Sequence, residues 1–178
     1  MQIVHYSKNR GKGYAVKRGM NKATGKYRLF MDADNSVDIS EVKKFLKHAD
    51  KGADVVVGSI AFQKDAQHSA WYRKALSSVS KLLIRSVTAL GVYDTQRGFK
   101  LFSAEAARTI FSMQTIDRWA FDIELLVIAK ANELKIKELQ VEWNNPDGSK
   151  VKLAHYVKTL FELGKIVKNR FQGVYQVR

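Results

Sequence analysis

The stretch Tyr27-Arg28-Leu29-Phe30-Met31-Asp32-Ala33-Asp34 decides the fold class. Its apolar centre predicts a strand over 27–31, and the two aspartates that follow are spaced i and i+2, so both point to one side of an extended backbone. In an open α/β sheet, ligands bind at the carboxyl ends of the strands. Asp32 and Asp34 can therefore share one Mg²⁺ or Mn²⁺ ion, since both metals prefer oxygen ligands. The competing interpretation is a turn or a helix cap, which aspartate also favours.

Short apolar runs alternate with amphipathic stretches on both sides of this strand. Upstream, the pattern predicts a strand over 3–6 and a helix that ends near Gly25. Downstream, Asp38 and Glu41 predict a capping box for a helix that runs to Lys51, and a strand over 53–57 follows. This alternation predicts an α/β layered fold in which crossover helices join parallel strands.

The rest of the chain continues the pattern. A basic amphipathic helix is expected over 71–90, with its apolar stripe either packed on the core or lying on a membrane. The elements expected after it are a strand over 99–102, helices from Ser103 and over 121–133, a strand over 135–143 and a second basic amphipathic helix over 153–170. Because no repeat or linker interrupts them, residues 1–178 are predicted to form a single domain.

Composition narrows the possible partners and compartments. A hydrophobic content of 46% suits a packed core, and the absence of cysteine excludes disulfides and thiolate metal sites. No signal peptide and no spanning stretch of roughly 20 apolar residues is apparent, so a cytoplasmic location is expected. The formal charge of +14 favours polyanionic partners such as phosphorylated substrates, an anionic membrane or nucleic acid, although it can equally serve solubility.

The segment Gly11-Lys12-Gly13 marks the start of the first helix. A helix N-terminus offers free backbone N–H groups and a positive dipole end to phosphate, so Lys12 is a candidate substrate-binding residue. The segment is not a Walker loop, because the first glycine of that motif and the Ser/Thr after its lysine are both missing, and Tyr14 follows Gly13. A flexible turn is the alternative.

Blocks in a fixed order resemble family 2 glycosyltransferases, and within them the dolichyl-phosphate β-glucosyltransferases and bacterial polyprenyl-phosphate glycosyltransferases. The resemblance covers nearly the whole chain. It lies in Asn9-Arg10-Gly11-Lys12-Gly13-Tyr14-Ala15, Phe30-Met31-Asp32-Ala33-Asp34, Gly58-Ser59, Asp94-Thr95-Gln96-Arg97-Gly98-Phe99-Lys100, Phe121-Asp122-Ile123-Glu124-Leu125 and Gly148-Ser149-Lys150.

The resemblance implies a GT-A, Rossmann-like fold with a mixed, mainly parallel sheet and helices on both faces. It further implies that Asp32 and Asp34 bind Mg²⁺ or Mn²⁺ on the diphosphate of a nucleotide sugar, with UDP-glucose as the expected donor and a polyprenyl phosphate in a membrane as the acceptor. By similarity Arg73 contacts the acceptor phosphate, Lys150 neutralises phosphate, and Asp122 faces the reaction centre. Arg73 and Lys150 can also be read as solvated surface residues, and Asp122 as a helix-dipole partner.

Two departures from the family pattern bear on activity. The chain begins where relatives would already have completed the segment that binds base and ribose, so an N-terminally truncated domain with doubtful activity on its own is expected. Ile60 stands where relatives usually have arginine after Gly58-Ser59, which removes one phosphate-binding cation.

Two other functions compete with glycosyl transfer. A non-catalytic basic module that binds a membrane or nucleic acid would show salt-sensitive binding without a metal, although no nucleic-acid motif is present. A sugar nucleotidyltransferase would form a nucleotide sugar from a triphosphate, but its glycine-rich nucleotide loop is not seen. For the glycosyltransferase, peripheral attachment at the cytoplasmic membrane face is expected from the two basic amphipathic helices, with no nucleic acid bound.

Overall fold

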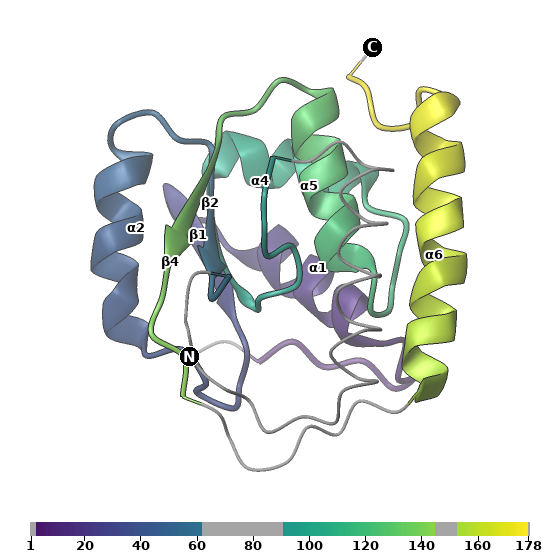
Figure 1. The fold of residues 1–178 in the computed structure, drawn as a ribbon, viewed down its shortest axis with the longest axis horizontal. Coiled ribbons are helices and arrows are strands. Elements are labelled where there is room, and N and C mark those ends of the chain that lie inside the picture. The colour runs from purple at the N-terminus through teal and green to yellow at the C-terminus, as the bar shows by residue number, and fades with distance from the viewer. Residues whose placement is uncertain (1–2, 62–90, 145–152, 178) are drawn as a thin grey trace.

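The computed structural model describes residues 3–61, 91–144 and 153–177, and the statements below concern these residues. Figure 1 shows a sheet flanked by helices. In chain order the elements are α1 (Lys12–Lys22), β1 (Tyr27–Met31), a 3₁₀ turn (Ile39–Glu41), α2 (Val42–Ala49), β2 (Val55–Ser59), β3 (Phe99–Ser103), α4 (Ala104–Met113), α5 (Phe121–Ala131), β4 (Ile136–Gln140) and α6 (Leu153–Phe171).

The sheet is mixed, with strand order β1-β3-β2-β4. β3 is antiparallel to both of its neighbours, whereas β2 and β4 are parallel, so β1, β2 and β4 run in one direction and β3 in the other. Met31 at the end of β1 pairs with Phe99 at the start of β3. The carboxyl ends of three strands and the amino end of the fourth therefore meet at one edge of the sheet.

Helices cover both faces of the sheet. Phe45 and Ala49 of α2 pack with Val56 and Leu101 on one face. The opposite face packs against α1, α4 and α5, and α6 lies outside α5 (Figure 1). Because side chains alternate along a strand, neighbouring residues such as Val55 and Val56 enter different clusters, and both faces of the central strands are apolar.

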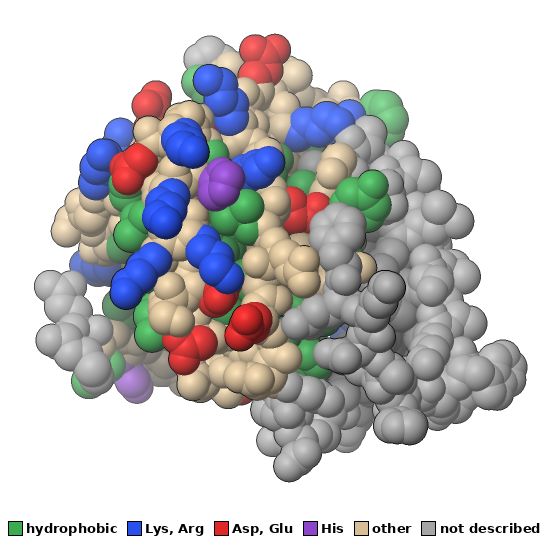
Figure 2. All heavy atoms as spheres, turned by 60° about the vertical axis from the view of Figure 1, so that its left-hand side comes forward, with side chains coloured by type: hydrophobic (Ala, Val, Ile, Leu, Met, Phe, Trp, Pro, Cys, Tyr) green, Lys and Arg blue, Asp and Glu red, His purple; other side chains and the backbone are tan. Residues whose placement is uncertain are grey.

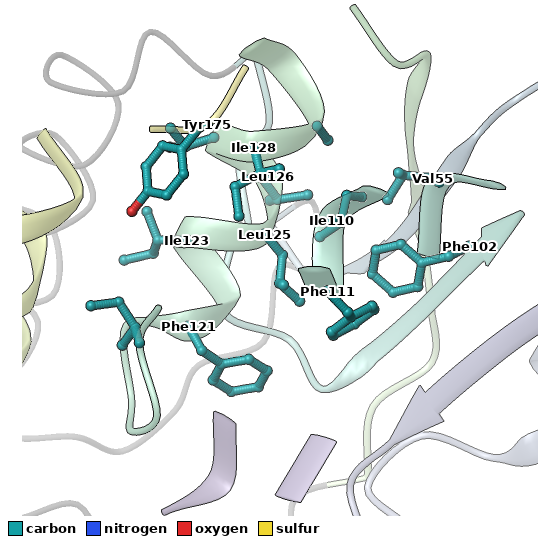
Figure 3. Packing of buried hydrophobic residues seen from close by; sticks show 14 of the residues in the cluster. Val55, Phe102, Ile110, Phe111, Phe121, Ile123, Leu125, Leu126, Ile128 and Tyr175 are labelled. Atoms are coloured by element: carbon teal, nitrogen blue, oxygen red, sulfur yellow. The ribbon is translucent and has the colours of Figure 1, made fainter. Parts of the chain in front are cut away.

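α5 is the central helix of the larger core cluster. All its residues from 121 to 129 are buried, as expected for a helix that is apolar on nearly every side. Phe121 points toward α1 and β1, while Leu125 and Phe111 of α4 fill the space next to Phe102 (Figure 3). The start of α5 is thereby held at the edge of the sheet described above.

Two predicted local features are wrong. Residues 3–6 form no strand, since Ile3 is 81% exposed and no ladder in the described ranges pairs with this segment; apolar residues alone do not provide a strand with a partner. Asp38 and Glu41 form no capping box. Asp38 Oδ1 accepts from the Ser40 N–H at 2.7 Å, and the Glu41 carboxylate accepts from Lys44 Nζ at 2.9 Å. Glu41 is the last residue of the 3₁₀ turn, and its carboxylate is taken up by the ion pair with Lys44.

The predicted helix over 71–90 lies outside the described residues. None of the helices within those ranges is long and apolar enough to cross a membrane.

Candidate functional site

Asp32 lies at the sheet edge, directly after β1. Its backbone N–H donates to Gly98 O at 2.8 Å, which extends the pairing of β1 with β3 by one step. The Asp32 carboxylate lies against the Cα of Gly98, so closely that a Cβ at that position would collide with it. The Asp94–Gly98 segment thus forms one wall around Asp32, and the absence of a side chain at Gly98 makes room for the carboxylate.

Lys12 approaches the same carboxylate from the start of α1. Its Nζ lies 2.6 Å from Asp32 Oδ1, and both side chains remain about a third exposed, at 29% and 33%. Gly11 before it has a φ of 115°, a conformation that favours glycine, and the Tyr14 N–H donates to Asp117 O at 3.0 Å. These contacts fix the direction in which Lys12 leaves the helix.

Asp34 is exposed and stabilises its own turn. Its Oδ1 accepts from the Ser36 N–H at 3.0 Å, across Asn35, whose φ of 56° is left-handed. That hydrogen bond, with a contribution from the positive charge of Lys12, lowers the pKa of the Asp34 carboxyl below its ordinary value. Asp34 therefore stays ionised, which a metal ligand requires.

Asp122, in the first turn of α5, is buried behind these residues. Its Oδ1 accepts from Lys100 Nζ at 2.5 Å, and Lys100 also donates to Arg97 O. Burial raises the pKa of the Asp122 carboxyl, while the positive charges of Lys100 and Lys12 oppose the rise. Asp122 thus lies within electrostatic reach of Asp32 and Lys12, but Lys100 already occupies one of its oxygens.

The loop before β3 is held by a second carboxylate network. Asp94 Oδ2 accepts from Arg97 Nε at 3.0 Å, and Glu138 of β4 accepts from the Tyr93 and Asp94 N–H groups at 2.9 and 2.8 Å. The guanidinium of Arg97 lies 4.8 Å from the centre of the Trp143 ring. Lys100 donates both to Arg97 O in this loop and to Asp122. The loop that packs against Asp32 is therefore also connected to Asp122.

Sequence reasoning assigned no role to Lys100, Asp94 or Glu138. A signal was available for the first two, because both lie in the Asp-Thr-Gln-Arg-Gly-Phe-Lys block. Glu138 lies in a strand and carries no such signal. Of the predicted site residues, the structure brings together Lys12, Asp32 and Asp122, with Asp34 two residues beyond Asp32; Arg73 and Lys150 lie outside the described residues.

A cavity of about 640 Å³ opens beside Lys12, at the start of α1. Tyr6, Asn9, Arg118 and Trp119 line it together with Lys12. Aromatic rings, an amide and two cations are suited to a ligand that combines a ring with negative charge.

The residues present fit a cation held jointly with a substrate. Among the described residues, no three His, Asp or Glu side chains come together as a ligand set. Asp32 and Asp34 supply two carboxylates, and the Lys12 ammonium next to Asp32 shows that a positive charge is accepted there. A Mg²⁺ or Mn²⁺ ion bound through one or two carboxylates ordinarily completes its shell with substrate phosphates and water.

Comparisons with known proteins agree on one family. The Glycosyl transferase family 2 profile matches residues 1–111. Relatives include dolichyl-phosphate beta-glucosyltransferases of Trichomonas vaginalis (37% identical, covering 99% of this chain and 56% of the relative), Dictyostelium discoideum (34%, 100% and 57%) and Homo sapiens (33%, 85% and 49%). The chain thus spans about half the length of the curated relatives it matches.

Solved structures match in fold. Glucosyl-3-phosphoglycerate synthase from Mycobacterium tuberculosis superposes with a TM-score of 0.64 in its UDP complex, at 15% identity, over 89% of this chain and 55% of the synthase. Its complex with Mn²⁺, UDP-glucose and phosphoglyceric acid gives a TM-score of 0.61, at 14% identity and the same coverage. The expected GT-A fold is confirmed, and the family match favours glycosyl transfer over the two competing functions. The chain belongs to glycosyl transferase family 2.

Proposed function

We propose that this chain is the part of a glycosyltransferase that transfers a sugar, with glucose as the first candidate, from a nucleotide-diphosphate sugar to a polyprenyl or dolichyl phosphate. The observation that carries the proposal is the pair Asp32 and Asp34 at the carboxyl end of β1, with Lys12 on Asp32 at 2.6 Å. UDP-glucose is the proposed donor. We further propose that the whole chain forms one domain.

The reaction breaks the bond between the sugar C1 and the diphosphate and forms a bond from C1 to an acceptor phosphate oxygen. Negative charge develops on the leaving diphosphate, and a Mg²⁺ or Mn²⁺ ion held by Asp32 and Asp34 would stabilise that charge as a Lewis acid. Lys12 would add a cation at the same phosphates, next to the N–H groups that open α1. The acceptor phosphate is already anionic, so positioning and charge neutralisation supply most of the rate.

Asp122 has a supporting role in this proposal. Because Lys100 occupies one of its oxygens, it contributes a fixed charge that orients Lys12 and Lys100 around the reaction centre. Arg73 and Lys150 are proposed to bind the acceptor and donor phosphates.

The acceptor's membrane is proposed to meet the outer face of α6. Phe161 and Phe171 are 78% and 87% exposed there, and they share a helical stripe with Lys165 and Lys168. On the inner side, Leu163 and Ile166 are buried, and Glu162 accepts from the Ala120 N–H at 2.9 Å. Exposed aromatic residues between lysines are typical of a helix that lies in a membrane interface. Attachment at the cytoplasmic face is part of this proposal.

Calorimetric titration with Mn²⁺ and UDP-glucose tests the function. We expect binding of the donor that requires Mn²⁺ and is lost in Asp32→Ala/Asp34→Ala. Asp50→Ala/Glu105→Ala removes the same charge from exposed positions at the opposite edge of the sheet and should bind like the wild type. Donor binding that survives without Mn²⁺ or in the first variant would contradict the proposed site.

A further inference from the structure

Lys12 connects two parts of the proposed site. Its Nζ pairs with Asp32 Oδ1, and its side chain also lines the cavity at the start of α1. Since about a third of each partner is exposed, the ammonium can leave the carboxylate without opening the core. The Lys12 Nζ also lies over the Phe121 ring, 5.8 Å from its centre.

The other basic side chains near the site pair with carboxylates other than Asp32 and Asp34. Lys100 is fully buried on Asp122, Arg97 is held by Asp94, and Arg10 pairs with Asp117 at 2.7 Å. None of these three carboxylates is a proposed metal ligand. In the described part of the site, Lys12 is thus the basic group whose carboxylate partner must also bind the cation.

We propose that Lys12 is a built-in counterion of Asp32, which competes with the divalent cation for this carboxylate and transfers to the donor diphosphate when the donor binds. The proposal rests on the proposed function, because Asp32 must be a metal ligand.

Electrostatics gives the competition its direction. An ammonium and a dication at one carboxylate repel each other, and solvent screens this repulsion only partly at a half-buried site. A cation that arrives alone must therefore displace Lys12. When a diphosphate is present, its oxygens accept the displaced ammonium in a charge-assisted contact. Cation and donor should then each strengthen the binding of the other, by the same factor.

The test measures Mn²⁺ binding rather than activity. Free Mn²⁺ is determined by electron paramagnetic resonance for the wild type and Lys12→Met, first without and then with UDP. We expect Lys12→Met to bind Mn²⁺ about tenfold more tightly than the wild type when UDP is absent. UDP should strengthen Mn²⁺ binding clearly in the wild type and much less in Lys12→Met.

Two controls separate competition from other effects of the substitution. Lys22→Met removes the same charge from the other end of α1, where the side chain is exposed, and should leave Mn²⁺ affinity unchanged. Lys12→Arg keeps the counterion and should bind Mn²⁺ no more tightly than the wild type. Circular dichroism confirms that each variant is folded.

The outcomes distinguish a failure of the counterion role from a failure of the proposed metal site. Mn²⁺ binding that is lost in Asp32→Ala but unchanged in Lys12→Met would overturn the counterion role and leave the metal site standing. No Mn²⁺ binding by any of these proteins, with or without UDP, would overturn the metal site and the counterion role together.

Discussion

Gly98 shows how a residue without a side chain can shape a binding site. The Asp32 carboxylate occupies the space that a Cβ at position 98 would need. The backbone hydrogen bond from Asp32 N–H to Gly98 O fixes the distance between the end of β1 and the loop before β3. The carboxylate is thereby aimed toward Lys12 instead of along the sheet edge.

Gly98→Ala should therefore damage the metal site while leaving Asp32 and Asp34 in the chain. The new methyl group must displace the Asp32 carboxylate, and we expect Mn²⁺ affinity in the presence of UDP to fall about tenfold or more, since a displaced ligand loses its coordination geometry. Gly19→Ala in α1 is the matched control, because a Cβ there meets no atom of the described residues within 4 Å. Equal affinities for the two variants would show that Gly98 does not position Asp32.

The pair formed by Lys100 and Asp122 should contribute to stability as a unit. Lys100→Met leaves the Asp122 carboxylate buried without its partner, which we expect to lower the free energy of unfolding by about 3–5 kcal/mol in urea titrations. Lys100→Met/Asp122→Leu removes both charges and should regain part of that loss.

An exposed ion pair provides the comparison. Lys26→Met breaks a contact with Asp50 in which both side chains are largely exposed, at 80% and 60%, and it should cost at most about 1 kcal/mol. If Lys100→Met cost no more than Lys26→Met, the buried pair would not be a stabilising unit.

The sequence revealed the site residues unevenly. Asp32, Asp34 and Lys12 could be proposed because they follow a strand or open a helix, where local rules connect position to ligand binding. Lys100 belongs to the block over 94–100, but local spacing gave it no role, because its partner Asp122 comes from a different element, α5. Pairing between distant residues is not encoded in local spacing.

At the scale of elements, α5 joins the site to the end of the chain. The buried Glu124 carboxylate accepts from the Thr115 and Ile116 N–H groups and from the Tyr175 hydroxyl at 2.7 Å. Gln114, the residue before Thr115, donates a hydrogen bond from its side-chain Nε2 to Gly13 O at 3.0 Å. The segment that supports the start of α1 is therefore held by the same carboxylate as the chain after α6.

Tyr175→Phe tests this connection. The substitution removes one donor from a buried carboxylate, and we expect the free energy of unfolding to fall by about 1.5–3 kcal/mol. Tyr27→Phe deletes a hydroxyl with the same 2.7 Å contact to a carboxylate, that of Asp50, but at the surface, and should cost about 1 kcal/mol or less. Similar losses for the two variants in urea titrations would argue against a special role for Glu124.

Most elements could be predicted from periodicity, and their arrangement could not. The strand over 27–31, the helix that begins after Ser103 and the buried helix from Phe121 are found as expected, because each has a clear local pattern. The insertion of β3 between β1 and β2, antiparallel to both, follows from tertiary pairing across a long connection. The prediction of a strand over 3–6 is wrong for the same reason, because a strand needs a partner that local pattern does not supply.

At the scale of the whole molecule, basic side chains lie on more than one side: among the described helices, α2 and α6 each carry exposed lysines. α2 and α6 lie on opposite sides of the sheet (Figure 1), and Lys and Arg side chains gather on the side that α2 covers (Figure 2). The formal charge of +14 would attract either side to an anionic surface. Only the outer face of α6 adds largely exposed Phe161 and Phe171 to its lysines.

Orientation on a membrane can therefore be read from matched variants. Lys165→Ala/Lys168→Ala on α6 and Lys43→Ala/Lys47→Ala on α2 remove the same charge, and each lysine near an anionic surface contributes about 1 kcal/mol. In flotation with phosphatidylserine vesicles we expect the α6 variant to bind about tenfold more weakly than the α2 variant. Phe161→Ala/Phe171→Ala should lose the binding that persists at high salt, because apolar insertion is not screened whereas charge attraction is. Equal loss from both lysine pairs, with no effect of the phenylalanines, would mean that charge alone brings the protein to the surface, with neither side preferred.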